Sequence, residues 1–212
     1  MTKNNSHLII CNGELPSKKV LKKLLTEHNY ILCADGGANH AKANKINPNI
    51  IIGDFDSILP ATKKYFKKVK QIKIEDQNST DLEKSLSYLL KEKILSATII
   101  GATGKRIDHT LANFSILLKF HKKGMKLKIV EDDFEIFVAT GRANFKTKIG
   151  QLVSIVPLIE SSGISTDGLK YSLKHESLTP GVREGVSNVA VKNNVSIVVT
   201  NGALIILIKT KK

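Results

Sequence analysis

The sequence predicts an α/β domain, built on a parallel sheet with helices on both faces, followed by a smaller all-β sandwich domain. Up to about residue 131, short apolar runs alternate with helical segments, which is typical of a parallel sheet with crossover helices. Beyond the acidic residues 131–133 the pattern changes to short β-branched runs without a convincing helix. We therefore expect an α/β domain over residues 1–130 and a β-sandwich domain over residues 131–212.

The strands expected in the first domain are rich in Ile and Val and show little alternation between apolar and polar residues. Such runs are typical of parallel strands covered on both faces, so they predict a doubly wound, Rossmann-like sheet. The expected strands are residues 7–11, 30–34, 49–52, 71–74, 97–100 and 126–130.

Start signals mark several of the intervening helices. The clearest is a capping box formed by Thr80 and Glu83, which predicts a helix running to about Lys93. Pro16 and Pro60 are expected in the first turns of two other helices, where proline is tolerated.

The strands expected in the second domain are short and separated by turn residues. They are residues 135–139, 152–157, 169–173, 189–192, 195–200 and 204–208. The pairs Asn193-Asn194 and Asn201-Gly202 separate the last three runs at hairpin spacing, which predicts an antiparallel sandwich or small barrel.

The composition excludes several classes of protein. A chain of 212 residues with 42% hydrophobic and 25% charged residues is neither disordered, collagenous nor a coiled coil. Cys11 and Cys33 fall inside apolar runs without metal-ligand spacing, so we expect reduced core thiols. The apolar runs are too short to span a bilayer, and the polar residues 1–5 do not resemble a signal peptide. We expect a cytoplasmic protein without membrane contact.

The net charge of the chain is unusually positive for a protein of this composition. With 33 Lys+Arg against 19 Asp+Glu, the chain carries +14, which suggests a polyanionic partner. The lysines, however, cluster on expected helix faces, and the chain has no Trp and no aromatic series between basic residues. We therefore expect no nucleic-acid binding and keep such a module as an alternative, recognisable by a steep loss of affinity with salt.

The aspartates among the first 120 residues all follow expected strands. The carboxyl ends of parallel strands meet at one ligand crevice, so these side chains are expected to converge there. A cation such as Mg²⁺, which takes oxygen ligands from carboxylates, would join them. The residues are Asp35, Asp54, Asp56, Asp76, Asp81 and Asp108.

The sharpest motif is Gly-Asp-Phe-Asp-Ser at residues 53–57. In extended backbone Asp54 and Asp56 point the same way and can share one ion, while Phe55 turns back into the core. A pair of turn or capping aspartates is the simpler alternative. An aspartyl-phosphate phosphatase is a further alternative, disfavoured because its nucleophile follows the first core strand and two strands precede this motif.

Two glycine-containing turns follow other strands. In the turn at residues 35–39 the glycines allow close backbone approach to a ligand, although an ordinary strand-to-helix turn looks the same. The run Gly-Ala-Thr-Gly-Lys-Arg-Ile-Asp-His at residues 101–109 is not a Walker A loop. Its Lys105 and Arg106 suit phosphate binding and Asp108 suits proton transfer or metal binding; a surface turn with a capping aspartate is the alternative.

Four motifs in this order resemble the thiamine pyrophosphokinase family, bacterial type: residues 34–39, 53–57, 76–82 and 101–109. The resemblance implies Mg²⁺-dependent transfer of the pyrophosphoryl group of ATP to the hydroxyl of thiamine, giving thiamine diphosphate and AMP. It also implies a homodimer, with thiamine bound between the catalytic domain of one subunit and the sandwich domain of the other.

The resemblance also implies roles for individual residues. The implied metal ligands are Asp54, Asp56 and Asp81. The implied catalytic residues are Asp54, Asp56, Arg106 and Asp108. The implied ATP-binding residues are Asp35, Gly36, Gly37, Asn39, Thr80, Gly101, Gly104, Lys105 and Arg106. The implied thiamine-binding residues are Gln77, Asp108, Ser187 and Asn188. Some family members stack a Trp on thiamine; this chain has none, and Tyr171 or an aliphatic surface is expected instead.

Another Mg²⁺-dependent phosphotransferase or phosphatase using the same acids is the remaining alternative. The reaction products distinguish this alternative from the thiamine pyrophosphokinase hypothesis, because ADP or free phosphate in place of AMP excludes pyrophosphoryl transfer.

Overall fold

The computed structural model of the chain describes residues 6–210. It divides into two compact units, of which the first ends at Glu131 and the second begins at Asp132. Residues 1–5, where the sequence shows no signal-peptide pattern, lie outside the described residues. Within residues 6–210, none of the helices has the length and apolar character needed to cross a membrane.

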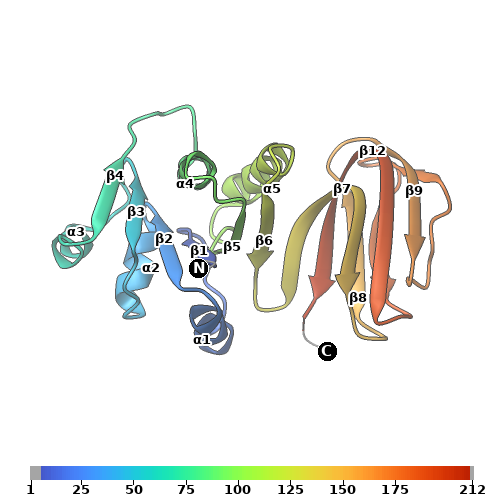
Figure 1. Ribbon diagram of the computed structural model, residues 1–212, viewed down its shortest axis with the longest axis horizontal. Helices are drawn as coiled ribbons and strands as arrows, with labels where there is room; N and C mark the ends of the chain where they lie inside the picture. Colours follow the sequence, from blue (N-terminus) through green and yellow to red (C-terminus); the bar gives the residue numbers. More distant parts are fainter. Residues whose placement is uncertain (1–5, 211–212) are drawn as a thin grey trace. The chain divides into compact units, whose positions relative to one another are not determined.

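The first unit is a parallel sheet with connecting helices, as predicted (Figure 1). Its elements are β1 (His7–Ile10), α1 (Lys18–Glu27), β2 (Tyr30–Ala34), α2 (Gly37–Ala43), β3 (Ile50–Gly53), α3 (Pro60–Tyr65), β4 (Lys70–Lys73), α4 (Asp81–Lys91), β5 (Ser96–Ile100), α5 (Ile107–His121) and β6 (Lys126–Val130). The strand order is β6-β5-β1-β2-β3-β4, and every adjacent pair is parallel. The order reverses at β1, which is where doubly wound sheets bind ligands.

Both faces of this sheet are covered. Figure 1 shows α1 and α2 on one side of the strands and α4 and α5 on the other. Alternate strand residues such as Leu8, Ile10 and Ile51 pack into one apolar cluster with helix residues. Cys11 and Cys33 are buried free thiols, as expected, and burial raises the pKa of Cys11 to about 12.

The helix-start predictions have two outcomes. Thr80 accepts a hydrogen bond from the backbone N–H of Glu83 (3.3 Å) and α4 follows at once, so the N-cap half of the capping box is confirmed, while the Glu83 carboxylate accepts from Lys119; the helix ends at Lys91, two residues before the expected end. Pro60 is the first residue of α3, also as predicted. The prediction for Pro16 is wrong, because the first helical hydrogen bond of α1 runs from Leu21 N–H to the Ser17 carbonyl, which leaves Pro16 before the helix.

The second unit is entirely β-structure and antiparallel. Its strands are β7 (Phe134–Lys146), β8 (Leu152–Pro157), β9 (Ser161–Asp167), β10 (Glu176–Leu178), β11 (Gly185–Val189) and β12 (Asn194–Lys209). One side of β12 pairs with β7 along both halves; the other side pairs with β9 in its first half and with β8 in its second. Strands β10 and β11 add to β9 and β8. The inward side chains, among them Val153, Ile197 and Ile206, form one apolar core.

Several strand predictions in this unit are wrong. The runs 195–200 and 204–208 are not a hairpin but the two halves of β12. Asn201-Gly202 forms an irregularity between them, since the register shifts between Val199 and Leu204 and Gly202 has a φ of +104°. The strand continues because each half has its own long-range partners.

Other strand predictions in this unit also differ from the structure. The run 169–173 is a loop with a single bridge from Leu169 to Ala190, although its Leu173 is buried in the core. Of the predicted strand 189–192, only Val189 belongs to a strand, as the last residue of β11. Strands β9 and β10 were not expected, because Ser, Gly, Thr and Asp dominate β9 and β10 has only three residues.

Candidate active site

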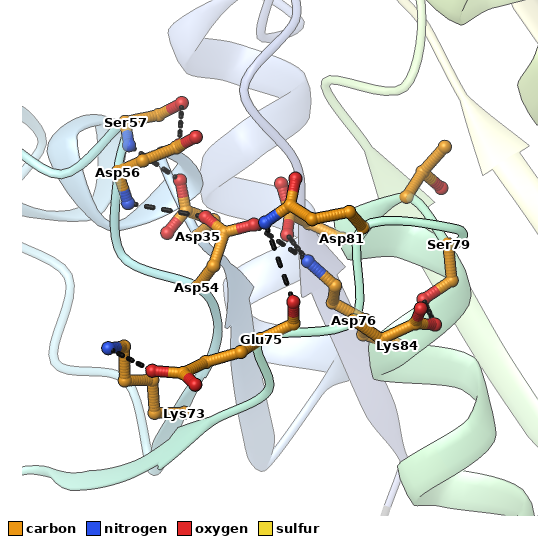
Figure 2. A network of polar contacts seen from close by, with 12 residues as sticks. Asp35, Asp54, Asp56, Ser57, Lys73, Glu75, Asp76, Ser79, Asp81 and Lys84 are labelled. Atoms are coloured by element: carbon orange, nitrogen blue, oxygen red, sulfur yellow. Dashed lines mark hydrogen bonds and ion pairs between the residues drawn. The ribbon is translucent and has the colours of Figure 1, made fainter.

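A group of acids lies at the carboxyl ends of neighbouring strands in the first unit. Asp35 follows β2, Asp54 and Asp56 follow β3, and Asp81 is the first residue of α4. Because β2 and β3 are adjacent and parallel, their ends present these side chains to one region (Figure 2). The convergence expected from the sequence is present for these residues.

Asp35, Asp54 and Asp56 form a group of carboxylates that could hold a cation. One carboxylate oxygen from each lies within 4.8 Å of the others. Asp35 is completely buried; its Oδ2 accepts the backbone N–H of Ser57 (3.1 Å), and its Oδ1 has no hydrogen-bond partner. Burial raises the pKa of Asp35, and the charges of Asp54 and Asp56 raise it further. A buried carboxylate oxygen without a donor, beside two more carboxylates, fits the oxygen ligand set of Mg²⁺.

A tight turn brings Asp54 and Asp56 together. The sequence analysis expected extended backbone at this motif. That prediction is wrong, because Phe55 has a φ of +71°. Instead Asp54 Oδ1 accepts the backbone N–H of Asp56 (3.2 Å). The ring of Phe55 packs against the apolar core of the unit, as expected.

Asp81 has a different neighbour from the other acids. The ammonium of Lys84 donates to Asp81 Oδ1 (3.2 Å) and to Asp54 Oδ2 (2.8 Å), as Figure 2 shows. The hydrogen bond from Lys84 lowers the pKa of Asp54, whereas burial and the charge of Asp35 raise that of Asp81. The carboxylate group brought together here contains Asp35 and not Asp81, and the metal role that the resemblance implies for Asp81 stays a prediction.

The glycine-containing loop after β5 lines a cavity of about 190 Å³ at the same end of the sheet. Gly101 has a φ of +66°, and a Cβ there would lie 2.7 Å from the carbonyl oxygen of Cys11. Lys105, also with positive φ, donates to the carbonyl of Asn12 (2.9 Å) and lies 3.2 Å from His40 Nε2. The cavity is lined by Gly101, Gly104, Lys105, Arg106, Thr80 and Asp81.

Sequence reasoning missed the loop after β1. Asn12 and Gly13 line the same cavity, and Gly13 N–H donates to the carbonyl of Gly101 (2.7 Å). The signal was an Asn-Gly pair directly after the first strand, at the switch point of the sheet.

The turn after β2 has a positioning role. The amide of Asn39 donates to the Ser57 carbonyl (2.8 Å) and accepts the backbone N–H of Leu59 (3.1 Å), so it ties the loop after β3 to α2. Gly37 packs against β1, because a Cβ there would lie 2.8 Å from the carbonyl carbon of Ile10. The Asn39 amide is thus engaged with the protein itself, and Gly36 lies against the Asn12 side chain.

The remaining residues implied by the resemblance lie outside this cavity lining. Gln77 is exposed, with its amide 3.5 Å from the Glu75 carbonyl. Ser187 and Asn188 belong to the second unit, where the Asn188 amide donates to the Tyr171 carbonyl (2.7 Å) and accepts its N–H (3.0 Å). Asn188 therefore holds the loop that presents the Tyr171 ring, which is 63% exposed.

Arg106 and Asp108 form an exposed ion pair at the start of α5. The Arg106 guanidinium donates two hydrogen bonds to the Asp108 carboxylate, one of them from Nε at 3.1 Å. This bonding to Arg106 lowers the pKa of Asp108 to about 2, so Asp108 is ionised throughout the neutral range. Arg106 also reaches the cavity lining.

Replacing Arg106 by Gln is expected to raise the pKa of Asp108 from about 2 toward its ordinary 3.8, because the charged donor is lost. The wild-type carboxylate stays ionised down to about pH 2, and the variant takes up its proton at higher pH. An NMR titration of the Asp108 carboxyl carbon measures the change, with Lys105→Gln as the control that leaves the value in place. An Asp108 pKa that is equal in wild type and Arg106→Gln would contradict the assignment.

Comparison with known proteins identifies relatives for both units. The model "Thiamin pyrophosphokinase, catalytic domain" matches residues 21–129, and "Thiamin pyrophosphokinase, vitamin B1 binding domain" matches residues 142–204. Thiamine pyrophosphokinase 1 of Oryza sativa subsp. japonica is 27% identical over 90% of this chain and 82% of its own length. Thiamine pyrophosphokinase of Bacillus subtilis is 25% identical over 87% of this chain and 89% of its own length.

Solved structures show the same fold. The Bacillus subtilis thiamine pyrophosphokinase superposes with a TM-score of 0.86 at 23% identity, covering 98% of this chain and 100% of that chain. Thiamin pyrophosphokinase from Candida albicans superposes with a TM-score of 0.87 at 18% identity, covering 98% of this chain and 90% of that chain. The α/β unit followed by a β-rich unit is thus the architecture of these relatives.

Proposed function

Because the chain belongs to the thiamine pyrophosphokinase family, we propose that it transfers the pyrophosphoryl group of ATP to the hydroxyl of thiamine, with Mg²⁺, giving thiamine diphosphate and AMP. The observation that carries the proposal is the carboxylate group of Asp35, Asp54 and Asp56 beside a cavity lined by Lys105 and Arg106. Carboxylates for a cation and fixed cations for phosphates are what phosphoryl transfer from a nucleotide requires.

In this mechanism the chain positions the reactants and stabilises charge. Asp35, Asp54 and Asp56 would hold Mg²⁺, which when bound neutralises charge on the phosphate oxygens. Lys105 and Arg106, which line the cavity, bind the phosphates. The thiamine hydroxyl oxygen bonds to the β-phosphorus, the bond from that phosphorus to the oxygen of AMP breaks, and AMP leaves. Asp108, ionised beside Arg106, accepts a hydrogen bond from the thiamine hydroxyl and orients it, and the hydroxyl proton is released to solvent as the new bond forms.

The second unit offers a candidate surface for thiamine. Lys170 Nζ lies 5.4 Å from the centre of the Tyr171 ring, so this ring already attracts a cation. Thiamine is itself cationic, and we assign Tyr171 as the ring that replaces the Trp of some relatives. Asn188 supports its loop. The homodimer and the cytoplasmic location expected from the sequence stay predictions.

Incubation of the protein with ATP, Mg²⁺ and thiamine is expected to yield AMP and thiamine diphosphate in equal amounts. Chromatography of the products measures both. Chelation of Mg²⁺ is expected to stop the reaction and added Mg²⁺ to restore it, because the carboxylates carry the metal. Production of ADP or free phosphate in place of AMP would refute the proposal of pyrophosphoryl transfer and favour the alternative phosphotransferase or phosphatase.

A further inference from the structure

Lys84 is a buried lysine inside the acidic site. It lies on the first turns of α4, its side chain is only 2% exposed, and its partners Asp54 and Asp81 are 16% and 34% exposed. A buried ammonium is costly unless carboxylates surround it. Its burial is therefore tied to these two acids, and sequence reasoning assigned it no role.

The position of Lys84 limits where metal ions can bind. Asp54 and Asp81 both reach the same nitrogen atom, so any second divalent ion joining these two carboxylates would need the place of the ammonium (Figure 2). The other side of Asp54 faces Asp35 and Asp56, where the carboxylate oxygens lie within 4.8 Å of one another. Asp54 thus contacts the Lys84 ammonium and also belongs to the candidate metal-binding group.

We propose that the Lys84 ammonium is a built-in cation that restricts the acidic cluster to one divalent ion, held by Asp35, Asp54 and Asp56, and that orients Asp54 toward it. Lys84 is then a positioning residue, because it acts through Asp54 and not on the substrates. This inference rests on the proposed function for the identity of the ion, but ion binding can be measured without any substrate.

The test is a Mn²⁺ titration of the full chain without nucleotide or thiamine, followed by electron paramagnetic resonance of the free ion. Wild type is expected to bind one ion per chain. Lys84→Met is expected to bind two, because Asp54 and Asp81 lose their ammonium and become a second site. Lys91→Met, which removes an exposed lysine from the same helix, is the matched control and is expected to behave as wild type.

The double variant Lys84→Met/Asp81→Asn covers the case in which the single variant does not fold, because it removes the lysine and one of its acids together. It is expected to bind one ion, with a dissociation constant raised about 10- to 100-fold, the range typical of lost support for a metal ligand. The same range is expected for the loss of turnover in Lys84→Met.

The outcomes separate this proposal from the proposed function. One ion per chain with an unchanged dissociation constant in the Lys84 variants, or two ions in wild type, overturns the role of Lys84 whatever the reaction. A wild type that binds one ion but makes no thiamine diphosphate refutes the proposed function and leaves the role of Lys84 in place.

Discussion

Replacement of Asp54 by Asn is expected to lower turnover by about 100-fold or more, above the 10- to 100-fold typical of residues that only support a metal ligand. Asp54 belongs to the carboxylate group and also pairs with Lys84, so the substitution weakens both the proposed metal site and the ion pair. The fold is expected to survive, because the asparagine oxygen still accepts from the ammonium and Asp81 still balances its charge. Turnover and thermal unfolding of the same preparation measure the two effects.

Glu75→Gln is the matched control for this substitution. Glu75 lies in the same network in Figure 2 but is exposed and paired only with Lys73 at the surface. Exposed pairs contribute little, so turnover is expected to stay within about twofold of wild type. Near-normal turnover of Asp54→Asn would refute the assignment of the carboxylate group as the metal site.

Replacement of Gly37 by Ala is expected to lower the free energy of unfolding of the first unit by about 3 kcal/mol, at the upper end of overpacking effects. A Cβ at this position would lie 2.8 Å from the carbonyl carbon of Ile10, so it meets the backbone of the central strand β1. Backbone atoms cannot turn away, and α2 must move off the sheet. The melting temperature is expected to fall by roughly 10 °C.

Gly36→Ala is the control in the same turn. Gly36 has a helical φ of −56°, and the three atoms nearest to its added Cβ would all belong to the Asn12 side chain, with Cγ at 2.5 Å. A side chain can rotate away, so the loss is expected to stay below about 1 kcal/mol. Equal losses for the two variants in a denaturant titration would show that packing against β1 is not the cause.

The first unit was predictable because its signals are local. Strands such as β3 are continuous apolar runs, and Thr80 and Glu83 mark the start of α4 within one turn of chain. The second unit was less predictable, since β9 is rich in polar residues and forms by pairing with a strand far along the chain. Pairing energy from distant partners outweighs local propensity there.

The strands of the parallel sheet and the aspartates at its carboxyl edge can be predicted from local patterns, because apolar runs and the aspartates that follow them are neighbours in the chain. Which carboxylates meet depends on the folded arrangement. It buried Asp35 beside Asp54 and Asp56, and it placed the Lys84 ammonium between Asp54 and Asp81. Such choices depend on how α4 packs against β2 and β3, and no local pattern encodes the distance between side chains that are far apart in the chain.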